Sequence, residues 1–301
     1  EIHGVKILTE TTAESFQANG NGNVAFVRTG EMLLPAEMVI VAVGVQPEVE
    51  LAKQGDLDIG ITGAIRVDDH MRTSDPDIYA AGDCVEMTDL ITNKPTYIPL
   101  GSTANKQGRV AAVNLCGGED HFPGVLGSTV CKVFDYCVGR TGLSELAARE
   151  LGYDVVTVLA PAPDREHFMP EARALFLKLV VDRDTRRLLG AQVTGPGEGD
   201  KRIQVAAMAI TAGMTVDQLA NVDLCYAPSY SAAMDNIITA ANVARNKLDG
   251  LMEGISPIEV HRMMQEDQPF AFLDVRTPGE HEQVRLPQAK LIPLGSLRGR
   301  L

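Results

Sequence analysis

Tryptophan is absent from this sequence, other aromatic residues are few, and the five cysteines follow no recognisable pattern. Cys84, Cys116, Cys131, Cys137 and Cys225 form no Cys-x-x-Cys pair and no even set. This spacing argues against a disulfide framework and against a cysteine metal site, so the sequence predicts no bound metal. Free thiols of this kind fit a reducing cytoplasm best.

Long apolar runs and an excess of positive charge are also missing. No run approaches the roughly 20 apolar residues that a membrane helix needs, and the start shows no signal-peptide pattern. Asp and Glu number 40 against 27 Lys and Arg, which gives a formal net charge of −13. Such a field repels nucleic acid and acidic membranes, so we predict neither partner and expect a local basic patch for any anionic ligand.

The apolar content is nevertheless sufficient for a large core. Apolar side chains make up 45% of the 301 residues, and chains of this size bury roughly three quarters of their unfolded surface. The sequence opens on a strand-like segment without an initiator Met. We therefore expect it to be the middle of a longer, multi-domain protein.

The first 43 residues predict a β-meander that leads into a fully apolar, buried strand at residues 38–43. A tight Asn-Gly-Asn-Gly-Asn turn at residues 19–23 contains Gly20-x-Gly22-x-x-Ala25, which superficially matches a dinucleotide fingerprint. Asn-Gly repeats between strands are typical of hairpins, and no helix follows to receive a pyrophosphate. The hairpin interpretation is therefore favoured.

Later segments predict a helix at 105–115 and, from residue 128, an α+β layer with a largely antiparallel sheet. The expected helices of this layer are 143–151, 202–212 and 230–248, and its strands include 155–159, 174–181 and 188–193. The Gly-rich turn at 194–200 is better explained as a strand-to-helix connection than as a phosphate cradle. A separate start follows, with a helix at 256–267, a strand at 270–276 and a loop at 277–283.

The stretch Thr-Ser-Asp-Pro-Asp-Ile-Tyr-Ala-Ala-Gly-Asp-Cys, residues 73–84, predicts a turn followed by a strand that ends on Gly82 and Asp83. Small residues allow close backbone approach, and the carboxylate can accept a hydrogen bond from a hydroxyl group. The pattern resembles the second flavin-binding motif of flavoproteins with two dinucleotide-binding domains. An Asp that merely caps a turn or helix is the alternative. The FAD-contacting residues that the resemblance implies here are Thr73, Ile78, Tyr79, Ala80, Ala81, Gly82 and Asp83.

A second segment, Pro-Leu-Gly-Ser-Thr-Ala-Asn-Lys-Gln-Gly-Arg-Val-Ala-Ala from residue 99, enters a helix. In the same flavoproteins a similar segment directs a helix N-terminus at the flavin pyrimidine, where backbone amides and the helix dipole favour negative charge. The resemblance adds Pro99, Leu100, Gly101 and Ala104 to the cofactor site. An ordinary junction between loop and helix is the alternative.

Residues 223–231, Asp-Leu-Cys-Tyr-Ala-Pro-Ser-Tyr-Ser, resemble a C-terminal signature of pyridine nucleotide-disulfide oxidoreductases. The branch is that of coenzyme A-disulfide reductases, NADH oxidases and persulfide reductases. The resemblance implies a homodimer in which Tyr226 lies across the interface, contacts the partner's flavin and assists catalysis. A phenol there can donate a hydrogen bond to a thiolate or relay a proton. A buried interface tyrosine without catalytic role is the alternative.

Residues 272–281 and 285–301 are similar to the N-terminal half of a rhodanese domain, which points to sulfane sulfur. The resemblance thus implies FAD and NAD(P)H as cofactors and a fold of α/β and α+β domains. We expect the C-terminal parts of an NAD(P)-binding domain and an FAD-binding domain, then a dimerisation domain and the start of a rhodanese-like domain. Their expected ranges are 1–43, 44–124, 125–250 and 255–301.

The substrate residues depart from the family pattern. Asn105 matches a position that contacts coenzyme A but is often His, Met234 stands where Lys is usual, and a second active-site Tyr would fall at Phe168 or Met169. Lys106 and Arg109 are candidate replacement cations, or ordinary solvated helix residues. The expected substrate is therefore a low-molecular-weight disulfide or persulfide, with coenzyme A or another small thiol as carrier.

The implied activity is reduction of that disulfide or persulfide, of the coenzyme A type, by NAD(P)H through FAD. The family's redox Cys and its Gly-rich loops are expected upstream of residue 1, so this chain alone should be inactive. An NADH oxidase that reduces O₂ is one alternative. A non-catalytic dimerisation and sulfur-relay module is another. The sequence does not distinguish NADH from NADPH.

Overall fold

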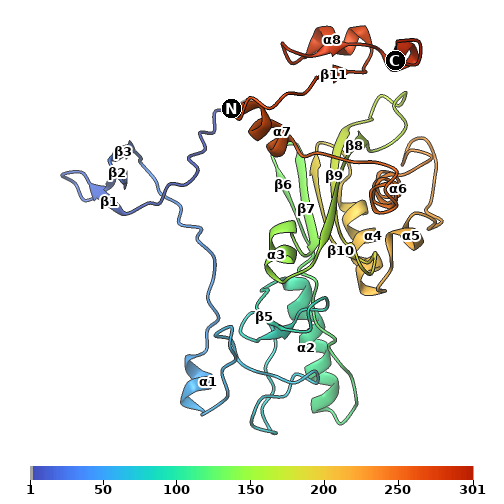
Figure 1. Ribbon diagram of the computed structural model, residues 1–301. Coiled ribbons are helices and arrows are strands. Elements are labelled where there is room, and N and C mark those ends of the chain that lie inside the picture. The colour runs from blue at the N-terminus through green and yellow to red at the C-terminus, as the bar shows by residue number, and fades with distance from the viewer. Residues whose placement is uncertain (1–2, 301) are drawn as a thin grey trace. The chain divides into compact units, whose positions relative to one another are not determined.

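The computed structural model describes residues 3–300, and the chain divides into two compact units. The first unit comprises the residues up to 88 together with 95–124, and the second comprises 89–94 and the residues from 125 onward. Figure 1 identifies the elements of each unit. Within the described residues, no helix has the length and apolarity required to cross a membrane.

The first unit begins with the predicted meander. Strands β1 (Ser15–Ala18), β2 (Val24–Thr29) and β3 (Met32–Pro35) pair antiparallel in the order β1-β2-β3. The side chain of Asn19 accepts hydrogen bonds from the amides of Asn21 and Asn23, and Gly22 has a φ of +81°. These are the local bonds of a hairpin turn, so the hairpin interpretation of residues 19–23 is confirmed, and Ala25 already lies in β2.

The predicted buried strand at residues 38–43 is wrong. Met38, Ile40 and Val43 are 80%, 82% and 90% exposed, and no strand pairs with this segment within residues 3–300. An apolar run becomes a buried strand only when neighbouring strands and helices cover it. Without such neighbours, the segment is neither paired nor buried.

The rest of the first unit contains α1 (Glu50–Gln54), the short strands β4 (Met87–Thr88) and β5 (Pro95–Thr96), and helix α2 (Gly101–Leu115). A small core joins Val49, Ala52, Ile65 and Val85. Helix α2 begins four residues before its predicted start. Residue 100 is extended, and the helical conformation starts at residue 101.

The strand predicted at residues 78–83 is also wrong. The segment makes one isolated bridge, between Arg72 and Tyr79, and then turns at Gly82. Its apolar character predicted a strand, but among residues 3–300 no neighbouring strand continues the ladder.

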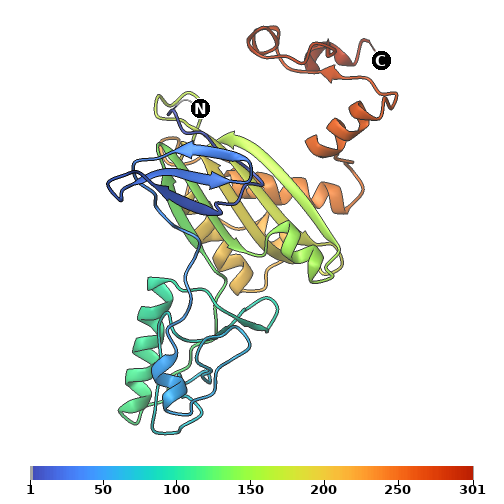
Figure 2. The ribbon, with the colours of Figure 1, turned by 90° about the vertical axis from the view of Figure 1, so that its left-hand side faces the viewer.

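The second unit is built on a five-stranded sheet of order β6-β7-β10-β9-β8, and its antiparallel pairing is as predicted. The strands are β6 (Thr129–Val133), β7 (Tyr136–Gly142), β8 (Val155–Pro163), β9 (Ala174–Asp182) and β10 (Leu188–Gly195). Helices α4 (Asp200–Thr211) and α6 (Asn236–Leu248) cover one face (Figures 1 and 2). The short helix α3 (Glu145–Glu150) packs near the other face, and α5 (Val216–Leu219) contacts α6.

Alternation along the strands explains this layering. Leu175, Leu177 and Leu179 on β9 are fully buried in the core beneath the two long helices, whereas Phe176 is 43% exposed on the opposite face. Helix α6 starts six residues after the predicted position 230, because Asp235 caps it by accepting a hydrogen bond from the amide of Ile237.

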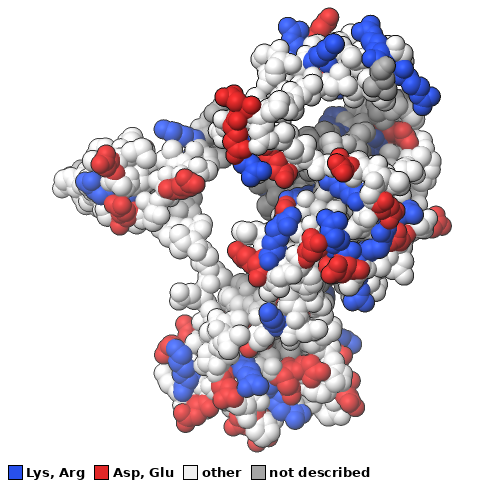
Figure 3. All heavy atoms as spheres, in the orientation of Figure 1, with Lys and Arg blue, Asp and Glu red and all other residues white. Residues whose placement is uncertain are grey.

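A buried arginine ties the elements of the second unit together. Arg202, 2% exposed on α4, bonds both carboxylate oxygens of Asp235 at 2.6 and 3.1 Å and the carbonyl oxygen of Asp164 at 2.7 Å. Burial raises the pKa of Asp164, but hydrogen bonds from Arg165 and from the amides of Arg173 and Glu198 outweigh it and lower that pKa. Elsewhere, on the face that Figure 3 shows, acidic and basic side chains are interspersed.

The last fifty residues contain α7 (Pro257–Gln265), the parallel strands β11 (Leu273–Asp274) and β12 (Lys290–Leu291), α8 (Pro278–Gln283) and α9 (Leu294–Leu297). The predicted loop at 277–283 is therefore wrong. Thr277 and Glu280 form a capping box that starts helix α8. The predicted strand at 270–276 shortens to the two residues that pair with β12 in the described part of the chain.

Replacing Arg202 with alanine should lower the free energy of unfolding of the second unit by about 3–5 kcal/mol, because Asp235 then loses its charge partner. Arg149→Ala, which removes an exposed ion pair with Glu145 on α3, should cost less than about 1 kcal/mol. Urea denaturation followed by circular dichroism measures both values. An equal decrease in the free energy of unfolding in the two variants would show that the buried Arg202–Asp235 pair stabilises the unit no more than an exposed ion pair does.

Candidate cofactor and substrate site

Hydrogen bonds within the turn at residues 73–78 fix the backbone of the candidate cofactor segment. The buried Thr73 hydroxyl contacts the carbonyl oxygens of Ile78 at 3.0 Å and Asp75 at 3.1 Å, and the Thr73 amide also donates to Ile78. Tyr79 is held by Arg72, whose guanidinium bonds the phenol oxygen at 3.3 Å. Thr73 and Tyr79 therefore use their hydroxyl groups within the protein and position the residues that follow.

Gly82 joins this segment to helix α2. Its amide donates a 2.9 Å hydrogen bond to the side-chain oxygen of Gln107, and its φ is +92°. A Cβ atom at this position would stand 3.7 Å from the Cβ of Ala104. The left-handed backbone favours glycine. The two segments predicted to bind the cofactor, residues 80–83 and 99–104, are thus brought together at this contact.

Two residues that sequence reasoning missed hold this junction. Gln107 is fully buried, and its Nε2 atom has no hydrogen-bond partner within the described residues. Tyr97 donates a 2.8 Å hydrogen bond to the backbone oxygen of Asp83, and burial, followed by the Asp83 charge, raises the pKa of Tyr97. Gln107 shares the buried face of α2 with Thr103, Val110 and Ala111. A polar residue at that helical spacing is the signal that could have identified it.

The Asp83 carboxylate itself is exposed and accepts no hydrogen bond from any part of residues 3–300. It is therefore available to hydroxyl groups of a ligand. The adjacent Cys84 thiol has a pKa raised by burial, and the Asp83 charge adds to this shift. A thiol with a raised pKa is a poor nucleophile, so this environment does not favour a nucleophilic role for Cys84.

The start of α2 offers a complementary surface. Leu100 caps the helix without a side-chain hydrogen bond, and its first turn contains no acidic residue. The amides of Gly101 and Ser102 have no acceptor in the described chain. Free amides at a helix N-terminus favour anionic or electron-rich groups. Together with Asp83 and the unpaired Nε2 of Gln107, this set fits a ligand that carries both hydroxyl groups and an electron-rich ring.

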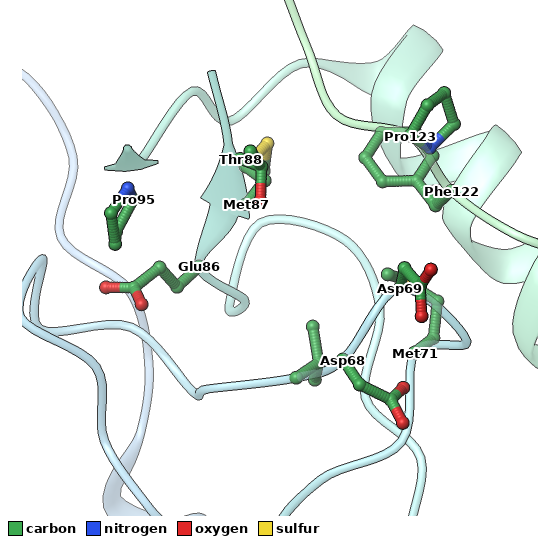
Figure 4. Close-up of a pocket in the computed structure, with 10 residues that line it drawn as sticks. Asp68, Asp69, Met71, Glu86, Met87, Thr88, Pro95, Phe122 and Pro123 are labelled. Carbon is green, nitrogen blue, oxygen red and sulfur yellow. The ribbon is translucent and has the colours of Figure 1, made fainter. Parts of the chain in front are cut away.

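A cavity of about 180 Å³ lies elsewhere in the first unit (Figure 4). Asp69 and Phe122 stand at one end of it, and Glu86 and Pro95 at the other. The carboxylate of Glu86 is occupied, because it accepts hydrogen bonds from the amide and hydroxyl of Thr62. None of the predicted cofactor residues lines this cavity.

The predicted substrate residues share the exposed side of α2. Asn105 donates a 2.8 Å hydrogen bond back to the carbonyl oxygen of Gly101. Lys106 and Arg109 are exposed and make no ion pair within residues 3–300. Two exposed cations of α2 that make no ion pair in the described chain can meet an anionic group.

Tyr226 belongs to the second unit, whereas the Asp83 segment belongs to the first. Its side chain is 52% exposed, and its phenol makes no hydrogen bond within the described part of the chain. Arg165 bonds the Ser229 carbonyl oxygen at 3.1 Å, and Glu166 accepts from the amide of Ala233. The segment that follows Tyr226 is thus anchored at residues 229 and 233. Phe168 and Met234 are also exposed, at 64% and 57%.

Comparison with known proteins extends these observations. Residues 1–108 match the family model described as pyridine nucleotide-disulphide oxidoreductase, and residues 128–238 match the dimerisation domain of the same family. The chain belongs to the pyridine nucleotide-disulphide oxidoreductase family. The resemblance drawn from residues 73–84 and 223–231 is therefore confirmed at the level of the family.

Among members of this family, the NAD(P)H coenzyme A polysulfide/persulfide reductase of Pyrococcus horikoshii is 42% identical over 77% of this chain and 52% of its own length. The NADH oxidase of Methanocaldococcus jannaschii is 36% identical over 82% of this chain and 54% of its own. A solved NAD-dependent persulfide reductase from A. fulgidus has a TM-score of 0.93 and 46% identity, covering 99% of this chain and 54% of that one. The chain spans about half the length of the curated relatives it matches.

Replacing Gln107 with alanine should free the Gly82 amide, because the buried acceptor disappears. Leaving such a donor unpaired costs about 1–3 kcal/mol, which corresponds to a roughly 5- to 150-fold faster hydrogen exchange of this amide if it exchanges by local opening. Arg109→Ala, on the exposed side of the same helix, is the control and should leave the rate unchanged. An unchanged rate at Gly82 in Gln107→Ala would contradict the proposed contact.

Proposed function

We propose that this chain is part of an FAD-dependent oxidoreductase that uses NAD(P)H to reduce a low-molecular-weight disulfide or persulfide of the coenzyme A type. The observation that carries the proposal is the unpaired Asp83 carboxylate, fixed beside the open start of α2 by the bond between Gly82 and Gln107. The names of the persulfide-reductase relatives support the choice of substrate class. When bound, FAD supplies the exchange of electrons between NAD(P)H and sulfur.

The residues of the first unit hold the cofactor in this proposal. Asp83 accepts a hydrogen bond from a hydroxyl of the ribitol chain, while Ala80, Ala81 and Gly82 present no bulky side chain against it. The amides of Gly101 and Ser102 face the pyrimidine edge of the ring, where they favour negative charge. Pro99, Leu100 and Ala104 complete the same surface.

Substrate binding is assigned to the exposed side of α2. Lys106 and Arg109 have no partner in the described chain, so their charges are available for phosphate groups of a coenzyme A carrier. Asn105 can release its bond to the carbonyl oxygen of Gly101 and donate to the same carrier. In this proposal, the two cations take the role of the Lys that the family usually has at the position of Met234.

The second unit contributes assembly and proton chemistry. The dimerisation-domain match supports a homodimer. In it, the exposed phenol of Tyr226 reaches the partner's cofactor and donates a hydrogen bond to the thiolate that leaves during reduction. We assign residues 1–43 and 44–124 to the NAD(P)-binding and FAD-binding domains, 125–250 to dimerisation and 255–301 to a rhodanese-like unit that handles sulfane sulfur.

An NADH oxidase that reduces O₂ is the second candidate, because a relative of that name is 36% identical over 82% of this chain. The two candidates differ in electron acceptor. Rapid O₂ consumption without added disulfide or persulfide would favour the oxidase.

Replacing Asp83 with alanine in the complete enzyme should weaken FAD binding by about 10- to 150-fold, because a charge-assisted hydrogen bond contributes roughly 1.5–3 kcal/mol. Absorbance of the flavin relative to protein, followed by titration of the apoenzyme with FAD, measures this loss. Asp77→Ala, an exposed residue of the preceding turn, should retain full occupancy. Full FAD occupancy and an unchanged affinity in Asp83→Ala would overturn the cofactor assignment.

Replacing Tyr226 with phenylalanine should lower kcat for NAD(P)H-dependent disulfide or persulfide reduction by about 10²–10³-fold, as expected for loss of one donor to a developing anion. FAD occupancy should not change. Tyr230→Phe, four residues along the same loop, is the control and should keep its activity. Wild-type kcat in Tyr226→Phe would remove this tyrosine from the catalytic step.

A further inference from the structure

Two loops of the first unit bring together two imidazoles and a carboxylate that the candidate cofactor site does not include. Ligand atoms of Asp69, His70 and His121 all lie within 4.8 Å of one another. We propose that these three side chains bind a divalent transition-metal ion of the Zn²⁺ class. The inference is independent of the proposed function, because it rests on other residues.

The distances between the side chains are close to those around one tetrahedral ion. Metal bonds of about 2.0–2.1 Å place neighbouring tetrahedral ligands about 3.3 Å apart. Nδ1 of His121 is 3.0 Å from Oδ2 of Asp69, and Nε2 of His70 is 3.8 Å from Oδ1 of the same carboxylate. The imidazole centroids are 4.1 Å apart. Small side-chain rotations therefore suffice to surround an ion.

The chemistry of the donors selects the kind of ion. Two imidazole nitrogens and one carboxylate oxygen suit Zn²⁺ or Co²⁺, whereas Mg²⁺ and Ca²⁺ require mainly oxygen ligands. A water molecule can complete the coordination.

The backbone beneath these ligands is fixed by Asn114 on α2. Its side-chain amide donates to the carbonyl oxygens of His70 at 3.0 Å and Asp120 at 2.9 Å, and its oxygen accepts from the Asp120 amide. The amide of Phe122 donates a 2.7 Å bond to the carbonyl oxygen of Asp69. Both loops are thus held in register before any ion arrives, which is the support that a metal site needs.

The ligands are accessible from solvent. The side chains of Asp69 and His121 are 61% and 52% exposed, and that of His70 is 28% exposed. A bound ion would connect residues 69–70, which precede α2, to residue 121, which follows it. Because this link exists only in the folded unit, metal binding stabilises that unit.

The test uses the full chain after chelator treatment, with its cysteines alkylated so that thiols do not compete. Titration with Co²⁺ should give the intense visible absorption of a tetrahedral complex, and calorimetric titration with Zn²⁺ should give one ion per chain. Zn²⁺ should also raise the Tm of the first unit. A weak, non-saturating response of the octahedral type would overturn the proposal.

Substitutions assign the ligands. His70→Ala and His121→Ala should each weaken Zn²⁺ affinity by more than about tenfold, since even loss of a supporting residue around a metal site has an effect of that size. His261→Ala, an exposed imidazole of the second unit, is the matched control and should bind as the parent does. Equal Tm values of all variants in chelator establish intact folding. Saturable binding that survives the double His70→Ala/His121→Ala variant would refute the site.

Discussion

The hydrogen bond from the Gly82 amide to the buried Gln107 side chain is the constraint on which the candidate cofactor site depends. It holds a left-handed glycine against the first turns of α2, where Ala104 leaves room for the backbone. Because of this contact, the Asp83 carboxylate and the open helix amides belong to one surface. Tyr97 adds a second anchor at the Asp83 carbonyl oxygen, so the carboxylate leaves the scaffold from a fixed backbone position.

Local patterns predicted much of the fold, and their failures have a common cause. The Asn-Gly turn at residues 19–23 and the strands around Leu177 and Ala191 were predicted correctly, because each finds its partner within the described chain. Residues 38–43 and 78–83 have the same apolar character but no adjacent strand to continue a ladder. Apolar composition therefore indicates that a segment can be buried, and tertiary pairing decides whether it is.

The candidate site could be proposed from sequence where a motif lies in one continuous stretch, as around Asp83 and Tyr226. It was not predictable where distant residues meet. Gln107 is 25 residues from Gly82, and His121 is 52 residues from Asp69. The helical spacing of Gln107 among buried neighbours is a sequence signal that it is buried. The two histidines lie in polar loops without such periodicity, so no comparable signal marks them. Such contacts come from the path of the chain and leave no local pattern.

The capping boxes of α7 and α8 have a consequence for acid sensitivity. Neither helix buries a side chain, and each start is closed by a glutamate, Glu259 or Glu280. Hydrogen bonds with Ser256 and Thr277 lower the pKa values of these glutamates, so their stabilisation is complete above the ordinary value of about 4.3 and is lost as the pH falls through the lowered value. Helices α4 and α6 differ in that each also buries an apolar face against the sheet, and this packing does not titrate. Acidification therefore weakens the starts of the two capped helices through protonation of one carboxylate in each.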